Sequence, residues 1–343
     1  MTNEQKGLLL GMGVGLGIAA TAYRRRRSTI SLREQVVLIT GSSRGLGFAL
    51  AEECARQGAR LIICARQPEP LECARQKLVA LGADVLALPC DIQDREQVQR
   101  LVEQGLAHFG KIDILINNAG IMLVGPALEM RLPDYEACMN TMFWGTLVTT
   151  LAVLPSMRAR KTGRIVNITS IGGRVSVPHL LTYSCAKFAA QGFSEGLHAE
   201  LAREGLKVTT VIPGLMRTGS HLNALMKGQR EEEYALFGFM ATSPLTATSA
   251  AHAARRIVRA ARRGETECII TPQAQLLSLF HGLCPALTTK ILSLISRVLP
   301  GSNQLDGEAR RGQESQSPLS AWLTRPGESA ARAYNQYVGK HSS

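Results

Sequence analysis

A tyrosine and a lysine in the middle of the chain have the types and spacing needed for acid–base chemistry. Tyr183 and Lys187 are four residues apart, so a helix would carry both side chains on one face. A nearby ammonium favours the phenolate, and we therefore expect the pKa of Tyr183 to lie below its ordinary value of about 10. That would make Tyr183 a proton donor or acceptor near neutral pH. The alternative is a solvated helix face, because such pairs also arise by chance.

A glycine-rich turn near the start of the chain predicts a phosphate-binding loop. The apolar run 35–40 predicts a buried strand, and Gly41-Ser42-Ser43-Arg44-Gly45-Leu46-Gly47 and a helical pattern follow it directly. Glycines let the backbone approach a pyrophosphate, and the free N–H groups of the first helical turn face its charge. The alternative is an ordinary turn between strand and helix. A second glycine-rich segment, 11–17, has no strand before it, and its i+4 glycines favour helix packing in a membrane.

Four segments, in this order, resemble the motifs of the short-chain dehydrogenase/reductase family. They are 40–47, Asn117-Asn118-Ala119-Gly120, Tyr183-x-x-x-Lys187 and Pro213-Gly214, and the resemblance covers roughly residues 34–272. It implies a Rossmann fold and an NAD(P)-dependent interconversion of a carbonyl and an alcohol. The motifs are specific for the fold and not for a substrate.

Alternating strand and helix patterns support the same fold class. We expect strands at 35–40, 60–65, 84–88, 113–117, 164–169, 207–212 and 267–271, and helices at 48–55, 71–81, 94–109, 133–160, 183–204 and 246–263. This alternation predicts an α/β protein with a doubly wound parallel sheet, in one catalytic domain over 34–272. Ligands of such sheets lie beyond the carboxyl ends of the strands, where the motifs also fall.

The resemblance and the charge pattern together assign a set of residues to the cofactor. They are Gly41, Ser43, Arg44, Gly45, Leu46, Gly47, Arg66, Asp91, Ile92, Asn118, Ala119, Gly120, Tyr183, Lys187, Pro213, Gly214 and Thr218. Asp91 would meet the adenine, or alternatively cap the helix that begins at 94. The Asn117–Gly120 segment would hold the sheet and line the cleft, or form a plain turn.

Charge at the end of the second strand predicts the choice of cofactor. An acidic residue there would bind the ribose diol of NAD, but the strand ends at Ala65-Arg66 with no acid. Arg44 lies in the glycine turn, and two guanidiniums can hold a 2′-phosphate. We therefore expect NADP(H), with NAD less favoured; the alternative is two surface arginines in a chain of net charge +12.

The resemblance also implies the catalytic set. Ser170 would orient the substrate carbonyl, Tyr183 would donate the proton, and Lys187 would bind the nicotinamide ribose and stabilise the tyrosinate. Asn140 would support the lysine through water, or alternatively be an ordinary polar helix residue. Thr169 should point to the opposite face of the strand from Ser170. A protein that senses or scaffolds without turnover is the alternative function, and the intact Ser170, Tyr183 and Lys187 set argues against it.

Apolar, methionine-containing sequence between 219 and 243 predicts a substrate lid. Family members place the lid here, and methionine adapts its shape to bulky ligands. We expect a lipophilic substrate such as a lipid, steroid, retinoid or ketosphinganine-like ketone. The alternative is a helical pair that packs on the core.

The two ends of the chain predict where the protein resides. Residues 7–23 form an uncharged apolar run, and four arginines follow at 24–27, which indicates a membrane anchor within 1–33 and a catalytic domain facing the cytoplasm. The sequence around Ala20–Ala22 also resembles a cleavage site. A second apolar stretch, 273–300, favours an interfacial helix pair or a dimer contact. From 301 to 343 the chain is polar, and we expect it to be flexible.

Composition excludes other classes of function. The eight cysteines show no C-x-x-C pattern and the seven histidines are dispersed, so we expect no metal site. No nucleic-acid motif is present, and the basic arginine run is explained by anionic lipid. The family often pairs through its long helices, so a homodimer or tetramer is expected.

Overall fold

A seven-stranded parallel sheet forms the centre of the protein. The computed structural model describes residues 29–302 and 308–337. The strand order is β11-β7-β6-β4-β1-β2-β3, with every pair parallel. The strands are β1 (Val36–Thr40), β2 (Arg60–Ala65), β3 (Val85–Pro89), β4 (Ile114–Asn117), β6 (Arg164–Ile168), β7 (Lys207–Ile212) and β11 (Glu267–Ile269). The predicted doubly wound fold is confirmed.

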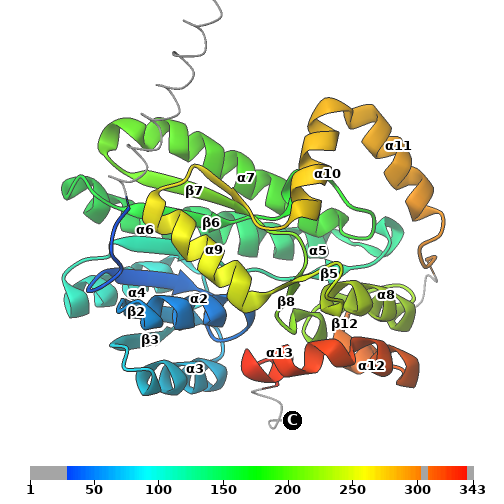
Figure 1. Ribbon diagram of the computed structural model, residues 1–343, viewed down its shortest axis with the longest axis horizontal. Helices are drawn as coiled ribbons and strands as arrows, with labels where there is room; N and C mark the ends of the chain where they lie inside the picture. Colours follow the sequence, from blue (N-terminus) through cyan, green and yellow to red (C-terminus); the bar gives the residue numbers. More distant parts are fainter. Residues whose placement is uncertain (1–28, 303–307, 338–343) are drawn as a thin grey trace, which may run out of the picture.

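Helices cover both faces of this sheet (Figure 1). One layer consists of α2 (Gly45–Arg56), α3 (Pro68–Ala80) and α9 (Ala250–Arg263). The other layer consists of α4 (Arg95–Phe109), α6 (Gly145–Ala159) and α7 (Leu181–Leu201). Strands covered on both faces need apolar residues at successive positions, and all five residues of β1 are buried.

The sheet reverses its order at β1, which determines where a ligand can bind. β1 pairs with β2 on one side and with β4 on the other. The connections from these strands leave in opposite directions, and in sheets of this kind ligands bind in a crevice beyond the carboxyl ends at such a point. The glycine turn follows β1 and the Asn118 turn follows β4, which brings both predicted motifs to this switch point.

The predicted helix 133–160 is divided into three parts. It consists of α5 (Leu132–Met139), a π-helical turn over Asn140–Trp144, and α6. This continuous stretch, Leu132–Ala159, is the one segment among the described residues that is long and apolar enough to span a bilayer. Val153 and Met157 pack it against the sheet, as in the core helix of a globular domain.

Two small sheets, which the sequence analysis did not predict, and several further helices accompany the main sheet. The small sheets contain β5 (Leu123–Val124), β8 (Met216–Arg217), β9 (Leu225–Met226), β10 (Thr248–Ser249) and β12 (Arg310–Arg311). Helix α8 (Arg230–Thr242) lies within the predicted lid sequence. Helices α10 (Pro272–Leu283) and α11 (Pro285–Ser296) fall in the apolar stretch 273–300, where a helix pair was expected; its interfacial or dimer function stays a prediction.

The C-terminal segment departs from its predicted flexibility. Residues 308–337 form β12, α12 (Pro318–Thr324) and α13 (Glu328–Ala333), and they fold back onto the domain (Figure 1). β12 pairs with β9, and α12 packs against α8. The prediction from polar composition is therefore wrong for 308–337, because these residues bury their polar groups in specific hydrogen bonds. The predicted anchor at 7–23 and the glycine-rich segment 11–17 lie outside the described residues.

Candidate active site

The glycine turn has a shape that only glycine permits at two positions. Gly41 has φ +64°, and a Cβ there would lie 2.7 Å from the Cα of Ala119. A Cβ at Gly47 would lie 2.2 Å from the carbonyl oxygen of Gly41. The Asn118 side chain donates to the carbonyls of Thr40 (3.0 Å) and Gly41 (3.1 Å), so the β4 turn supports the β1 turn. The predicted residues Asn118, Ala119 and the glycines are thus brought together.

Backbone donors remain available at the start of α2. The N–H of Gly45 donates to the carbonyl of Tyr334 at 2.9 Å. Within the described residues, the N–H groups of Leu46 and Gly47 donate to no acceptor, because the first bond of the helix is Phe48 to Arg44. Two open donors at a helix N-terminus, beside a turn that cannot take a Cβ, fit a pyrophosphate.

Buried polar contacts fix the strands behind this crevice. The amide of Asn117 donates to the hydroxyl of Thr150 and to the side-chain oxygen of Asn167, both at 2.9 Å. Asn167 in turn donates to Ser194 at 3.0 Å. The chain of bonds ties β4 to β6, α6 and α7, which is the sheet-holding function that the resemblance implied for this segment.

Positive charge gathers at the end of β2. Burial lowers the pKa of the Arg44 guanidinium, and the like charges of Arg311 and Arg66 lower it further. Arg44 is held by Gln67 and by Asn223, the latter at 3.3 Å, while Arg66 is exposed. The charges of three guanidiniums therefore act on one another near the glycine turn.

Asp91 lies where the third strand ends, but the capping alternative is wrong. The N-cap of α4 is Asp94, whose carboxylate accepts from the backbone N–H groups of Glu96 and Gln97. Asp91 instead accepts from the N–H of Gln93 at 3.1 Å. Its neighbour Ile92 is buried beside Gly145, where an added Cβ would lie 2.5 Å from the Ile92 side chain.

Ser170, Tyr183 and Lys187 meet at the carboxyl end of β6. Both Tyr183 and Lys187 lie on α7, and Ser170 hydrogen-bonds Tyr183. A Cβ on Gly172 would lie 3.2 Å from the Tyr183 ring, so this glycine leaves the ring its place beside Ser170. The Ser170 hydroxyl also accepts from the N–H of Gly172 at 3.0 Å. Thr169 instead donates to the carbonyl of Val211 at 2.6 Å, away from this group.

The electrostatics of the tyrosine differ from the expectation. Burial raises the pKa of Tyr183 to about 12, although the hydrogen bond with Ser170 opposes the rise. The predicted lowering of this pKa by the lysine is wrong for this structure. The Lys187 ammonium lies 5.7 Å from the centroid of the Tyr183 ring and donates to the carbonyl of Ile168. Tyr183 is therefore a neutral phenol at neutral pH, and it can donate a proton without prior protonation.

Lys187 is buried, and its pKa is lower than that of an exposed lysine. Its ammonium donates to the Ile168 carbonyl at 2.8 Å, and burial lowers its pKa to about 8. The group is thus still mainly charged at pH 7 and becomes neutral in the mildly alkaline range.

The structure does not bring Asn140 to the lysine. Asn140 begins the π-helical turn with an exposed side chain, whereas Met142 is buried in a cluster with Ala186 and Tyr183. Lys187 is buried whereas Asn140 is exposed, so the structure adds no support for the relay through water, which stays a prediction. The buried position on this turn is occupied by a thioether, which neither donates a proton nor binds water strongly.

The segment after β7 closes the opposite side of the crevice. The carbonyl of Pro213 accepts from the N–H of Ile171 at 2.9 Å, which joins this segment to the residue after Ser170. A Cβ on Gly214 would lie 2.4 Å from the Thr271 hydroxyl. Thr218 is buried, and its carbonyl accepts a hydrogen bond from Gln336.

The lid sequence has both buried and exposed apolar side chains. Met226 and Tyr234 belong to a small buried cluster, so they pack the lid onto the domain. Leu236, Phe239 and Met240 on α8 are exposed. The packing alternative therefore holds for the first group, and the second group remains available to an apolar ligand.

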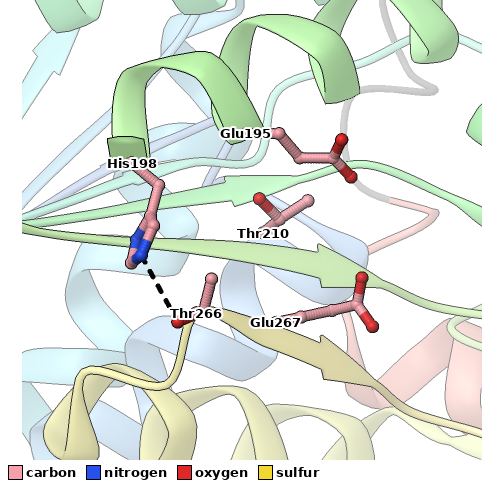
Figure 2. Close-up of a pocket in the computed structure, with 5 residues that line it drawn as sticks. All are labelled: Glu195, His198, Thr210, Thr266 and Glu267. Atoms are coloured by element: carbon pink, nitrogen blue, oxygen red, sulfur yellow. Dashed lines mark hydrogen bonds between the residues drawn. The ribbon is translucent and has the colours of Figure 1, made fainter. Parts of the chain in front are cut away.

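A pocket of about 270 Å³ lies elsewhere, between α7 and the edge of the sheet (Figure 2). It is lined by Glu195, His198, Thr210, Thr266 and Glu267, none of which is a predicted site residue. Both carboxylates that line it, Glu195 and Glu267, pair with Arg174. Among the described residues, no group of three or more histidine, cysteine or acidic side chains is placed to hold a metal ion.

Sequence reasoning missed two features of the site. The first is the C-terminal segment, whose Arg311, Asn335 and Gln336 reach the glycine turn from far along the chain. The second is the buried pair of His179 and Glu233, 2.6 Å apart, which ties α8 to the loop before Tyr183. No local sequence motif marks either feature. The one available signal was the polar side chains of 308–337, which can form buried hydrogen bonds.

Comparisons with known proteins agree with this geometry. The family model described as short chain dehydrogenase matches residues 35–227. A dehydrogenase/reductase SDR family protein 7-like protein of Anopheles gambiae is 37% identical, over 74% of this chain and 80% of its own. A 3-oxoacyl-[acyl-carrier-protein] reductase of Synechocystis is 34% identical, over 63% of this chain and 93% of its own. A crystal structure of a short-chain dehydrogenase from Streptomyces avermitilis is similar with TM-score 0.65 and 29% identity, over 77% of this chain and 98% of that one.

The chain belongs to the short-chain dehydrogenase/reductase family. It is an oxidoreductase, and its family uses NAD(P) cofactors.

Proposed function

We propose that the protein is an NADP(H)-dependent reductase of a carbonyl on a lipophilic substrate. The observation that supports this most is the meeting of Ser170, Tyr183 and Lys187 at the carboxyl end of β6, on the same edge of the sheet as the glycine turn. The reverse reaction, oxidation of the secondary alcohol, uses the same groups.

The cofactor would be held by residues on both sides of the switch point. The open N–H groups of Leu46 and Gly47 suit the pyrophosphate. Arg44, Arg66 and Arg311 suit a 2′-phosphate, which is the charge argument for NADP(H) over NAD(H). When bound, the nicotinamide supplies or accepts the hydride.

The protein's own residues would manage the substrate oxygen. The Ser170 hydroxyl and the Tyr183 phenol are neighbours, so one carbonyl oxygen can accept a hydrogen bond from each. With a pKa of about 12, Tyr183 keeps its proton at neutral pH and donates it as the oxygen gains negative charge. The Lys187 ammonium then stabilises the tyrosinate and provides a bond for the nicotinamide ribose.

Exposed apolar side chains on α8 support a lipophilic substrate. Leu236, Phe239 and Met240 form an adaptable surface after the Thr218 segment. The similarity to a 3-oxoacyl-[acyl-carrier-protein] reductase is compatible with an acyl or other lipophilic ketone.

We also propose that the protein works at a membrane, with its catalytic domain in the cytoplasm. Helices α10 and α11 stand away from the sheet as an arm (Figure 1). Leu276 and Leu283 on this arm are 70% and 73% exposed, and Leu294 is exposed too. The same chain carries the apolar run 7–23 and its arginines, so a lipid surface is the partner that would cover the arm. Co-sedimentation with anionic liposomes tests this, and loss of binding in Leu276→Asp/Leu283→Asp would support it. A stable dimer that the same substitutions dissociate would contradict it.

Turnover tests the function itself. The purified full chain is given NADPH or NADH with long-chain acyl, steroid and retinoid ketones, and oxidation of the reduced cofactor is followed at 340 nm. We expect reduction with NADPH to exceed reduction with NADH, and Arg66→Asp to shift the preference toward NADH. A preference for NADH that Arg66→Asp leaves unchanged contradicts the charge argument. No turnover with any ketone contradicts the lipophilic substrate.

A further inference from the structure

We propose that residues 334–336, called the C-terminal clasp, are positioning residues that set the affinity for the dinucleotide. The clasp connects two neighbouring loops, the glycine turn and the Thr218 segment. This inference rests on the proposed function, because it concerns the same cofactor site.

One side of the clasp holds the glycine turn. The carbonyl of Tyr334 accepts from the N–H of Gly45 at 2.9 Å, and the Asn335 amide donates to the carbonyl of Ser43 at 3.1 Å. Lys77 on α3 donates to the Asn335 side-chain oxygen at 2.5 Å. The turn that would cradle the pyrophosphate is therefore fixed from outside at two of its residues.

The other side of the clasp holds the segment after β7. Gln336 donates to the carbonyl of Thr218 at 2.9 Å, and its side-chain oxygen accepts from Asn223 at 2.8 Å. The close approach requires Gly219, where an added Cβ would lie 2.5 Å from the Cα of Ala331. The side-chain oxygen of Asn223 also accepts a hydrogen bond from Arg44, so Asn223 links Gln336 to the glycine turn.

The burial of Asn335 and Gln336 indicates that the clasp has one stable position against the two loops. Asn335 and Gln336 are only 1% and 3% exposed, and both ends of each side-chain amide have a partner. Buried amides are stable only when they are hydrogen-bonded, so a shifted clasp would leave polar groups unpaired. The two loops are consequently held at a fixed separation before any ligand arrives.

The clasp uses one backbone donor of the glycine turn and leaves the next two unused. Tyr334 takes only the Gly45 donor, and the N–H groups of Leu46 and Gly47 stay open. A preformed site avoids the entropic cost of ordering its loops on binding, so clasp substitutions should weaken affinity. If the clasp instead blocked the site, its substitution would increase the affinity for the dinucleotide.

The test measures binding of NADPH to the full chain by fluorescence titration. Gln336→Ala removes both bonds to the Thr218 side, and we expect the Kd to rise about tenfold. The matched control is Gln316→Ala, because Gln316 is an amide of the same C-terminal segment that bonds Tyr234 and touches neither loop. The control should bind within about twofold of the wild type. At saturating NADPH, kcat of Gln336→Ala should stay within about twofold of the wild type, so that the effect falls on cofactor affinity.

Each outcome has a definite meaning. If the wild type binds no NADPH, the proposed function fails and the clasp fails with it. If the wild type binds and Gln336→Ala binds equally or more tightly, only the clasp is overturned. If Gln336→Ala does not fold, Asn335→Ala removes the bond from the clasp to Ser43 in the glycine turn, and the same rise in Kd is expected.

Discussion

The ammonium nitrogen of Lys187 lies 2.8 Å from the carbonyl oxygen of Ile168, the last residue of β6. This bond fixes the lysine to the strand whose end carries Ser170, and not to the tyrosine one helical turn away. The lysine is thus a buried charge with one carbonyl partner, and burial lowers its pKa to about 8.

Alkaline pH should reduce activity through Lys187. The charged form is needed to stabilise a developing tyrosinate, so kcat/KM for carbonyl reduction should fall as pH rises through about 8. A pH profile of the wild type between 6 and 10 measures this. A flat profile across that range would show that the charge of Lys187 does not matter to the reaction.

Removing the buried charge should stabilise the protein. Between pH 8 and 10.5 the unfolded chain keeps a proton that the native lysine gives up, so native stability rises with pH there. Below pH 8 the native state bears the full cost of burial. Lys187→Met should therefore raise the free energy of unfolding at pH 7 by roughly 1 to 3 kcal/mol. Urea unfolding at pH 7 and pH 10 checks it, and a less stable variant at pH 7 would be the contrary result.

His221 should make the fold sensitive to acid. Burial lowers the pKa of His221 from 6.5 to about 4. Between pH 4 and pH 6.5 the unfolded chain therefore binds a proton at this residue that the native protein does not bind. Stability should fall as pH falls from 6.5 to 4, and His221→Gln should flatten that slope. His108 is exposed, and His108→Gln is the control that should leave the slope unchanged.

The phenol of Tyr183 should be needed for turnover and not for cofactor binding. Tyr183→Phe keeps the ring beside Gly172 and removes the proton donor, so we expect a loss of at least about a hundredfold in kcat. The Kd for NADPH should change little. Tyr135→Phe, a partly buried tyrosine on α5, is the control. Near-full turnover in Tyr183→Phe would remove this residue from the chemistry.

Asn140 should be dispensable. Its side chain is exposed on the π-helical turn while Met142 is buried, so Asn140→Ala should retain at least about half of the wild-type kcat. A loss comparable to that of Tyr183→Phe would restore the relay that the sequence suggested.

Local patterns in the sequence predicted the sheet because each strand is an unbroken apolar run. The bounds of β2 and β7 were predicted to the residue, and the glycine turn was placed at the end of β1. The grouping of Tyr183, on α7, with Ser170, after β6, was expected from the family resemblance. These features depend on neighbours in sequence or on the regular geometry of the fold.

Features that depend on distant contacts could not be predicted. The pKa of Tyr183 is set by burial, which the spacing of Tyr183 and Lys187 cannot reveal. Asn140 begins a π-helical turn and is exposed, although the helical pattern around it is continuous in the sequence. The polar composition of 308–337 indicated flexibility, yet the side chains of Asn335 and Gln336 bond to partners more than 100 residues away in the sequence.

The bond between Asn335 and Ser43 joins residues 292 positions apart. Contacts of such separation form late, and a chain leaves the ribosome from its amino end. During synthesis the hydrogen bond from Asn335 to the β1–α2 turn can therefore form only after almost the whole chain has been made. A prematurely released chain would carry the complete tyrosine–lysine pair and still lack the support of this turn.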